Sequence, residues 1–121
     1  MRADAEAEIQ RIDAALDLVR LSLDWEKALR RLDELNAKVE DPTLWDKPKE
    51  AEAVMRERRQ LESAITTVRE IDEAKTGTVE LIELAEMEGD AALADEGVAD
   101  LTMLADRADR DKVSALLSGE A

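Results

Sequence analysis

Along the first third of the chain, hydrophobic residues recur in steps of three and four, the period of one face of an α-helix. The N-terminal stripe consists of Ala5, Ile9, Ile12, Leu16, Val19 and Leu23. A second stripe consists of Trp25, Ala28, Leu32, Leu35 and Val39. The step of two from Leu23 to Trp25 puts the stripes out of phase, so one straight helix would turn its apolar face outward. We therefore expect two helices, over about residues 2–21 and 23–40, with Ser22 or Asp24 as the N-cap of the second.

Two prolines bracket a short turn after the second stripe. Asp41 precedes Pro42, and the residue before a proline is disfavoured in the helical region, so the second helix should end here. Residues 42–45 fit a single tight turn that Asp41 can cap, and we expect Trp45 to be buried there as a plug. Pro48 fits the first turn of the next helix, where its missing N–H is no loss. The predicted structural anchors of the fold are Trp25, Trp45, Pro42 and Pro48.

The rest of the chain predicts a long helical hairpin. Helical spacing of apolar residues from Ala51 to Ala85 predicts a helix over about residues 47–88, with at most a bend at Gly77. Gly89 suits a left-handed C-terminal position, and Asp90 suits the N-cap of a last helix over about residues 90–117. The sequence Ser-Gly-Glu at residues 118–120 should end that helix. The prediction is an all-α fold: one helical domain over residues 1–121, an up-and-down bundle of about four helices with a long antiparallel, coiled-coil-like hairpin.

The composition supports helices and excludes most site chemistry. Charged residues make up 40% of the 121 residues and aromatic residues only 2%, which is typical of long helices rather than β-sandwiches. The chain has no His and no Cys, which excludes catalytic and metal sites built on those residues. The four glycines are too far apart for a phosphate-binding loop, and the small basic clusters lack interleaved aromatic residues. We predict no enzymatic activity, no cofactor, no metal and no direct nucleic-acid site.

No segment of the sequence is typical of a membrane or export signal. The N-terminus is acidic and lacks the apolar centre of a signal peptide. The longest unbroken apolar run, residues 91–94, is far shorter than the ~20 residues that span a bilayer. We therefore expect a cytoplasmic protein without membrane contact.

Charge is distributed unevenly along the chain. The formal net charge is −14, and no Lys or Arg occurs between Lys75 and Arg107. One interpretation is that the acidic stretch is simply a solvated helix face. The other is that the end of the hairpin binds a basic partner. In that case the candidate partner-binding residues are Glu83, Glu86, Glu88, Asp90, Asp95 and Glu96.

Three segments together carry a family resemblance. Residues 23–36 read Leu-Asp-Trp-Glu-Lys-Ala-Leu-Arg-Arg-Leu-Asp-Glu-Leu-Asn, residues 41–46 read Asp-Pro-Thr-Leu-Trp-Asp with a proline at 48, and residues 55–62 read Met-Arg-Glu-Arg-Arg-Gln-Leu-Glu. This combination resembles the N-terminal helical domain of the bacterial peptide chain release factor 2 family. The resemblance covers all 121 residues, including the Ser-Gly-Glu ending.

The resemblance implies one domain of a translation termination factor. The complete factors of that family read UGA and UAA through a Ser-Pro-Phe tripeptide and promote peptidyl-tRNA hydrolysis through a Gly-Gly-Gln loop. Neither tripeptide occurs in this sequence, so no decoding or catalytic residue carries over. The implied partners are the ribosome, at the factor-binding entrance near the stalk base of the large subunit, and the GTPase release factor. The alternative is a free-standing helical adaptor or coiled-coil interaction protein.

Overall fold

The computed structural model describes residues 1–118 and consists of helices joined by short turns. The elements are α1 (Ala3–Leu23), α2 (Trp25–Glu40), the 3₁₀ turn η1 (Pro42–Asp46), α3 (Pro48–Glu88) and α4 (Ala91–Ser118). Residues 1–118 contain no β-strand, so the predicted all-α bundle is confirmed. The expected Ser-Gly-Glu ending lies, apart from Ser118, outside the residues that the structure describes.

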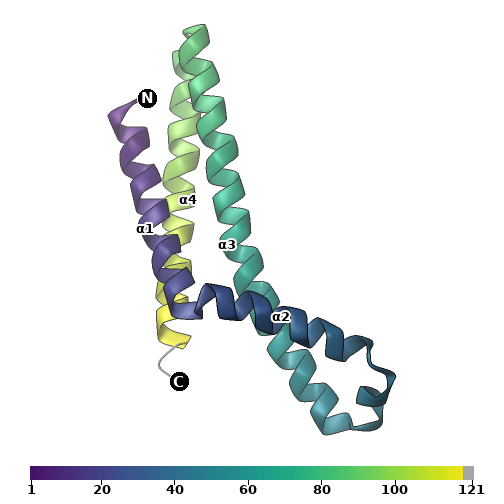
Figure 1. The fold of residues 1–121 in the computed structure, drawn as a ribbon. Helices are drawn as coiled ribbons and strands as arrows, with labels where there is room; N and C mark the ends of the chain where they lie inside the picture. Colours follow the sequence, from purple (N-terminus) through teal and green to yellow (C-terminus); the bar gives the residue numbers. More distant parts are fainter. Residues whose placement is uncertain (119–121) are drawn as a thin grey trace.

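The helices form two parts that share α3 (Figure 1). The bundle consists of α1, α4 and the C-terminal half of α3, with α1 parallel to α4 and α3 antiparallel to both. The arm consists of α2, η1 and the N-terminal half of α3, and it leaves the foot of the bundle at an angle. The first two helices therefore pack on different parts of the α3–α4 hairpin.

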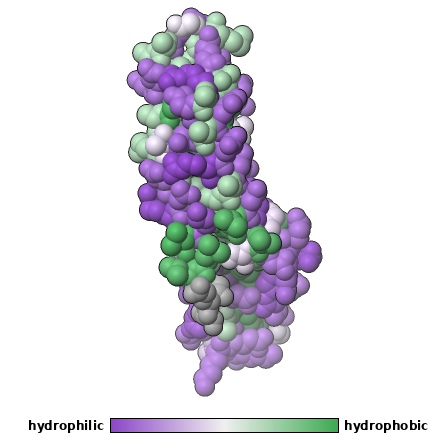
Figure 2. All heavy atoms as spheres, turned by 90° about the vertical axis from the view of Figure 1, so that its left-hand side faces the viewer, coloured by the Kyte–Doolittle hydropathy of each residue, from purple (hydrophilic) through white to green (hydrophobic). Residues whose placement is uncertain are grey.

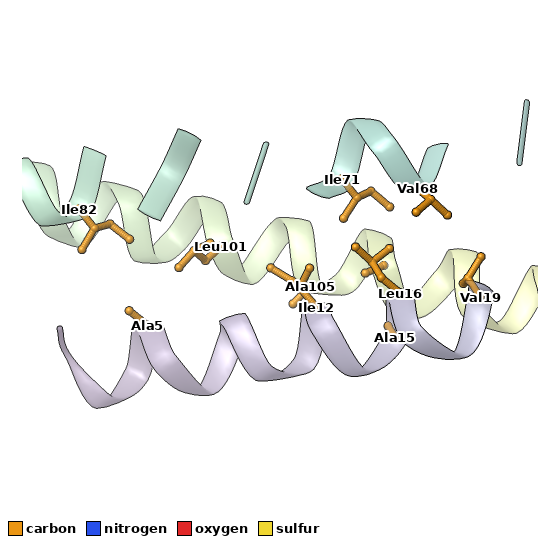
Figure 3. Packing of buried hydrophobic residues seen from close by; sticks show 11 residues of the cluster. Ala5, Ile12, Ala15, Leu16, Val19, Val68, Ile71, Ile82, Leu101 and Ala105 are labelled. Carbon is orange, nitrogen blue, oxygen red and sulfur yellow. The ribbon is translucent and has the colours of Figure 1, made fainter. Parts of the chain in front are cut away.

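Each part has its own hydrophobic core. The bundle core is formed by the buried side chains of Ala5, Ile12, Ala15, Leu16, Val19, Val68, Ile71, Ile82, Leu101, Ala105 and Ala108 (Figure 3). Alanine recurs on α1 and α4 in this core, and its small side chain lets neighbouring helices approach closely. The arm core is smaller and consists of Leu35, Leu44, Ala51 and Val54. Burial of apolar surface is the dominant favourable term in folding, so the bundle carries most of the stability of the molecule.

Asp24 forms the sharp corner between bundle and arm. Its φ of 54° places it in the left-handed region, where it ends α1 and begins α2. The predicted break at Leu23–Trp25 is therefore present, but the expected side-chain cap is not. The Asp24 carboxylate makes no capping hydrogen bond, and the Ser22 hydroxyl instead donates to the Ala115 carbonyl at 3.3 Å. The backbone turn alone reorients the second apolar stripe.

The α3–α4 hairpin closes as the local sequence predicts. Gly89, with φ of 69°, is the left-handed C-cap of α3. The Asp90 carboxylate accepts a hydrogen bond from the Leu93 N–H at 3.0 Å at the start of α4. At Gly77 α3 continues as one 41-residue helix. No helix within residues 1–118 is both long and apolar enough to cross a membrane.

Candidate functional site

The tip of the α3–α4 hairpin carries all six carboxylates predicted to bind a partner. Every one of these side chains is exposed, and the left-handed turn at Gly89 brings those on α3 close to those on α4. We call this surface the acidic tip, defined by Glu83, Glu86, Glu88, Asp90, Asp95 and Glu96. Unbalanced charge at one end of a molecule attracts and orients a partner of opposite charge.

Three of the six carboxylates make contacts inside the molecule. Glu86 lies 3.7 Å from the N-terminal ammonium group, and Asp95 accepts a hydrogen bond from the Arg2 guanidinium. Asp90 caps α4. Glu83, Glu88 and Glu96 have no ion pair within the residues that the structure describes. These three are the carboxylates whose charge is available to a partner.

Sequence reasoning missed Arg2 and the N-terminus as neighbours of the acidic tip. Arg2 and Asp95 are 93 positions apart, and they meet because α1 runs parallel to α4. No local motif marks such a contact. The positive charge absent from residues 76–106 is thus partly supplied by the beginning of the chain.

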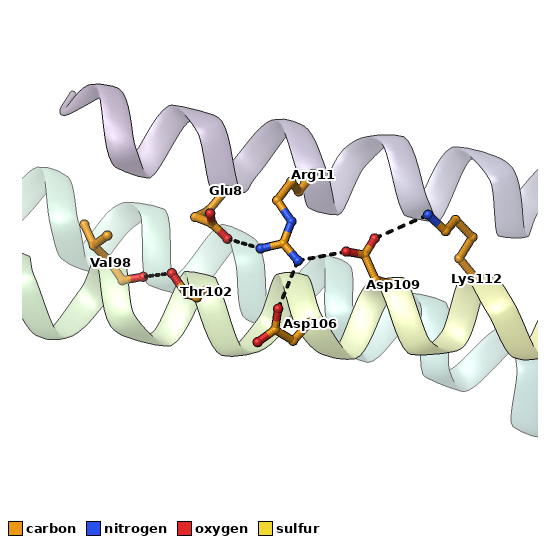
Figure 4. Close-up of polar contacts among 7 residues, drawn as sticks. All are labelled: Glu8, Arg11, Val98, Thr102, Asp106, Asp109 and Lys112. Atoms are coloured by element: carbon orange, nitrogen blue, oxygen red, sulfur yellow. Dashed lines mark hydrogen bonds and ion pairs between the residues drawn. The ribbon is translucent and has the colours of Figure 1, made fainter.

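An ion network joins α1 and α4 (Figure 4). The Arg11 guanidinium donates to Glu8 on its own helix at 2.8 Å, and to Asp106 and Asp109 on α4 at 2.9 and 2.8 Å. The hydrogen bond from Arg11 holds the pKa of Asp109 below its ordinary value, against the opposing effect of desolvation. Lys112 lies 3.6 Å from Asp109 on the other side. These contacts occur in the same packing of α1 on α4 that brings Arg2 to the tip.

Trp45 is not the buried plug that the sequence predicted. Its side chain is 53% exposed at the far end of the arm, whereas the neighbouring Leu44 is 5% exposed and belongs to the arm core. Asp41 caps the turn as expected, because its carboxylate accepts from the Thr43 N–H at 2.9 Å. Pro42 and Pro48 occupy the first turns of η1 and α3, as predicted.

Trp25, the other predicted anchor, does pack against the bundle core. The guanidinium carbons of Arg20 and Arg69 lie 5.6 and 5.9 Å from the centre of its ring, within the range of cation–π attraction. The indole therefore joins α1, the start of α2 and α3 at the corner of the molecule.

A groove of about 880 Å³ lies where the arm meets the foot of the bundle. Its walls include Leu23 from α1, Gln60 and Ser63 from α3, and Asp111 and Ser114 from α4. The Oδ2 atom of Asp111 is shielded from solvent and has no hydrogen-bond partner within residues 1–118. Burial raises the pKa of this carboxyl above its ordinary value, and the nearby charge of Arg107 opposes the shift.

The polar and charged residues of the part of the chain that the structure describes lie at or near its surface. No polar or charged residue of this part of the chain is buried, and none of its acidic groups clusters in a way that could hold a metal ion. The charged side chains lie on helix surfaces and mostly pair with neighbours. The acidic tip remains the candidate binding surface that the sequence predicted.

Comparison with known proteins gives consistent matches. The PCRF domain family matches residues 28–121. Peptide chain release factor 2 of Caulobacter sp. (strain K31) is 54% identical over 98 residues, which cover 81% of this chain and 27% of that protein. The proteins of the same name from Roseobacter denitrificans and Paramagnetospirillum magneticum are 46% and 44% identical over 121 residues, covering 100% of this chain and 32% and 33% of theirs. The chain thus spans no more than about a third of the length of these relatives.

Proposed function

Because the chain belongs to the PCRF domain family and is similar to peptide chain release factor 2 over most of its length, we propose that residues 1–121 act as one docking domain of a translation termination factor. Its place of action is the ribosome, in the cytoplasm. The observation that supports docking is the acidic tip, where Glu83, Glu88 and Glu96 are exposed at one end of the hairpin and have no ion pair among residues 1–118. The matched relatives are named for a role in peptide release, which requires access to the ribosome.

The proposed contact of the acidic tip is a basic protein at the stalk base of the large subunit, beside the factor-binding entrance. A protein of net charge −14 is repelled by RNA phosphates, so a basic ribosomal protein is the surface that it fits. The GTPase release factor is a second proposed partner, through coupling at the same entrance. Decoding and peptidyl-tRNA hydrolysis are not proposed for this chain, since the sequence holds neither Ser-Pro-Phe nor Gly-Gly-Gln.

The test removes the unpaired charge of the acidic tip. We would replace Glu83, Glu88 and Glu96 together with Gln and measure binding of the chain to ribosomes from Roseobacter denitrificans by co-sedimentation over a range of salt concentrations. Glutamine is chosen over lysine because a new cation would itself bind RNA. We expect affinity to fall about tenfold at low salt, and the difference from the original chain to vanish at high salt.

The matched control removes the same charge from the arm. Asp33, Glu40 and Asp46 are exposed and have no ion pair in the described part of the chain, so they are replaced by the corresponding amides. Ribosome binding of this variant should be unchanged. An equal loss of ribosome affinity in both variants would mean that net charge alone causes the effect, and it would contradict docking through the tip. No binding of the original chain would favour a helical adaptor that acts elsewhere.

A further inference from the structure

The large hydrophobic side chains that are exposed on α3 lie close to its C-terminal end, at the acidic tip. Leu81, Leu84 and Met87 are 36%, 49% and 85% exposed. Their spacing of three residues makes them neighbours along the surface of the helix. We call these three residues the apolar row. Further from the tip, the outer side of α3 is polar and carries residues such as Glu73 and Glu80.

Within residues 1–118, no helix covers the outer side of α3 at the tip. In the bundle α3 packs against α1 and α4, and α2 follows α3 only along the arm (Figure 1). Ile82 and Ala85, which alternate with the apolar row, are fully buried, whereas the row lies outside the bundle core. On the side of the bundle where α1 lies, Figure 2 shows hydrophilic and only weakly hydrophobic residues at the tip end. The apolar row is therefore an unpartnered face of α3.

Carboxylates flank the apolar row on the surface of α3. Residues four positions apart on a helix are neighbours, so Leu84 lies between Glu80 and Glu88, and Met87 lies beside Glu83. All three carboxylates are exposed and have no ion pair within residues 1–118. An apolar row with free negative charge on both sides is complementary to an apolar row with positive charge on both sides.

We propose that the apolar row binds a basic, amphipathic helix of a protein partner. The partner's apolar side chains pack on the row, and its lysines or arginines pair with Glu80, Glu83 and Glu88. Helices bind one another through such faces, with apolar contacts three and four positions apart. The proposal rests on the proposed docking role, because it names the chemistry of the partner at the same end of the molecule. RNA or a second copy of this acidic chain would bring negative charge against these carboxylates, so neither fits.

The two components of this contact differ in their dependence on salt. Salt screens the attraction between exposed charges, but it does not weaken the burial of apolar surface. We would replace Leu84 and Met87 with Gln, which leaves the net charge unchanged, and measure co-sedimentation with ribosomes over a range of salt concentrations. The affinity of this row variant should fall about tenfold or more at low and at high salt alike. The amide variant of the acidic tip should instead lose affinity only at low salt.

The matched control replaces Leu21 and Met103 with Gln, because these side chains are 77% and 70% exposed and lie away from the tip. The ribosome affinity of this control variant should equal that of the original chain, and circular dichroism checks that both variants keep their helices. Full affinity in the row variant would overturn the proposal and leave charge-based docking through the tip intact. Equal loss in the control variant would also overturn it, because the effect would then not be specific to the row.

Synthetic peptides separate this proposal from ribosome docking itself. Two labelled peptides of roughly 20 residues have the same content of Leu, Lys and Ala. Leucines spaced by three and four form one apolar face in the first peptide and are scattered in the second. Fluorescence anisotropy should show that the original chain binds the first peptide about tenfold more tightly than the second. The row variant should lose this preference, and the control variant should keep it.

The peptide results decide the proposal even if ribosomes are not bound. Equal binding of the two peptides by the original chain would show that the tip responds to charge alone, and it would overturn the proposal. Preference for the first peptide without binding to ribosomes would support a site for a basic helix and contradict the ribosomal role. Loss of the preference in the control variant would place the peptide outside the tip and overturn the proposal.

Discussion

At the scale of single residues, the choice between Leu44 and Trp45 decides how the arm closes. Successive side chains on a 3₁₀ helix point about 120° apart, so two neighbours cannot enter the same core. Leu44 faces α3 and is buried, and Trp45 therefore points into solvent despite its larger apolar surface. The larger side chain led to the wrong prediction that Trp45 is buried. The geometry of the 3₁₀ turn explains why Leu44 is buried instead.

The two substitutions to alanine at this turn should differ sharply. Leu44→Ala leaves a cavity in the arm core and should lower the free energy of unfolding by about 2–4 kcal/mol. Trp45→Ala removes an exposed side chain and should lower it by less than about 1 kcal/mol. Urea unfolding followed by circular dichroism measures both. Similar losses for the two variants would mean that Trp45 is buried in solution.

At the scale of the helices, α3 and α4 approach each other closely at Gly97. A Cβ atom built there would lie 2.4 Å from Cγ1 of Ile82, which is fully buried in the bundle core. Gly97 therefore has a packing role. Gly77 in α3 differs, because a Cβ atom there would meet nothing within 4 Å. The two glycines have the same helix propensity but opposite surroundings.

Alanine at these two glycines should shift the stability in opposite directions. Gly77→Ala should raise the free energy of unfolding by about 0.5–1 kcal/mol, since alanine loses less backbone entropy in a helix. Gly97→Ala has the same favourable entropy effect, but crowding of Ile82 should lower the free energy of unfolding by about 1–3 kcal/mol. We therefore expect Gly97→Ala to be less stable than the original chain. Thermal unfolding of the two variants beside the original chain measures the difference. A higher free energy of unfolding in both variants would contradict this, because it would show that α3 and α4 can move apart at Gly97 without losing packing energy.

Features that depend on neighbours in sequence could be predicted, and those that depend on distant contacts could not. The turn at Gly89, the caps at Asp41 and Asp90 and the position of Pro48 follow from local backbone chemistry. The acidic tip could be predicted as a run of carboxylates without Lys or Arg. Which of its members remain unpaired depends on Arg2 and the N-terminus, and these reach the tip only through the packing of α1 on α4. The angle between arm and bundle likewise depends on the left-handed turn at Asp24.

At the scale of the whole molecule, arm and bundle differ in the size of their cores. Among the residues that the structure describes, eleven buried residues form the bundle core and four form the arm core. Smaller apolar burial gives weaker resistance to opening, so the arm should open without unfolding of the bundle.

Amide hydrogen exchange should resolve this difference. We expect α2 and the N-terminal half of α3 to exchange with a lower opening free energy than the bundle helices. Leu35→Ala should lower the opening free energy of the arm further and leave the amides of α1 and α4 unchanged, because Leu35 belongs to the arm core. A uniform decrease across all helices would instead show that arm and bundle unfold as a single unit.

The unbroken course of α3 through both parts has a mechanical consequence. As one helix of 41 residues, it measures on the order of 60 Å and forms a stiff rod from the far end of the arm to the acidic tip. A displacement imposed on α3 where it begins, at Pro48, should therefore be transmitted along the helix toward Glu88. While the arm stays folded, we therefore expect the orientation of the arm and the position of the acidic tip to change together.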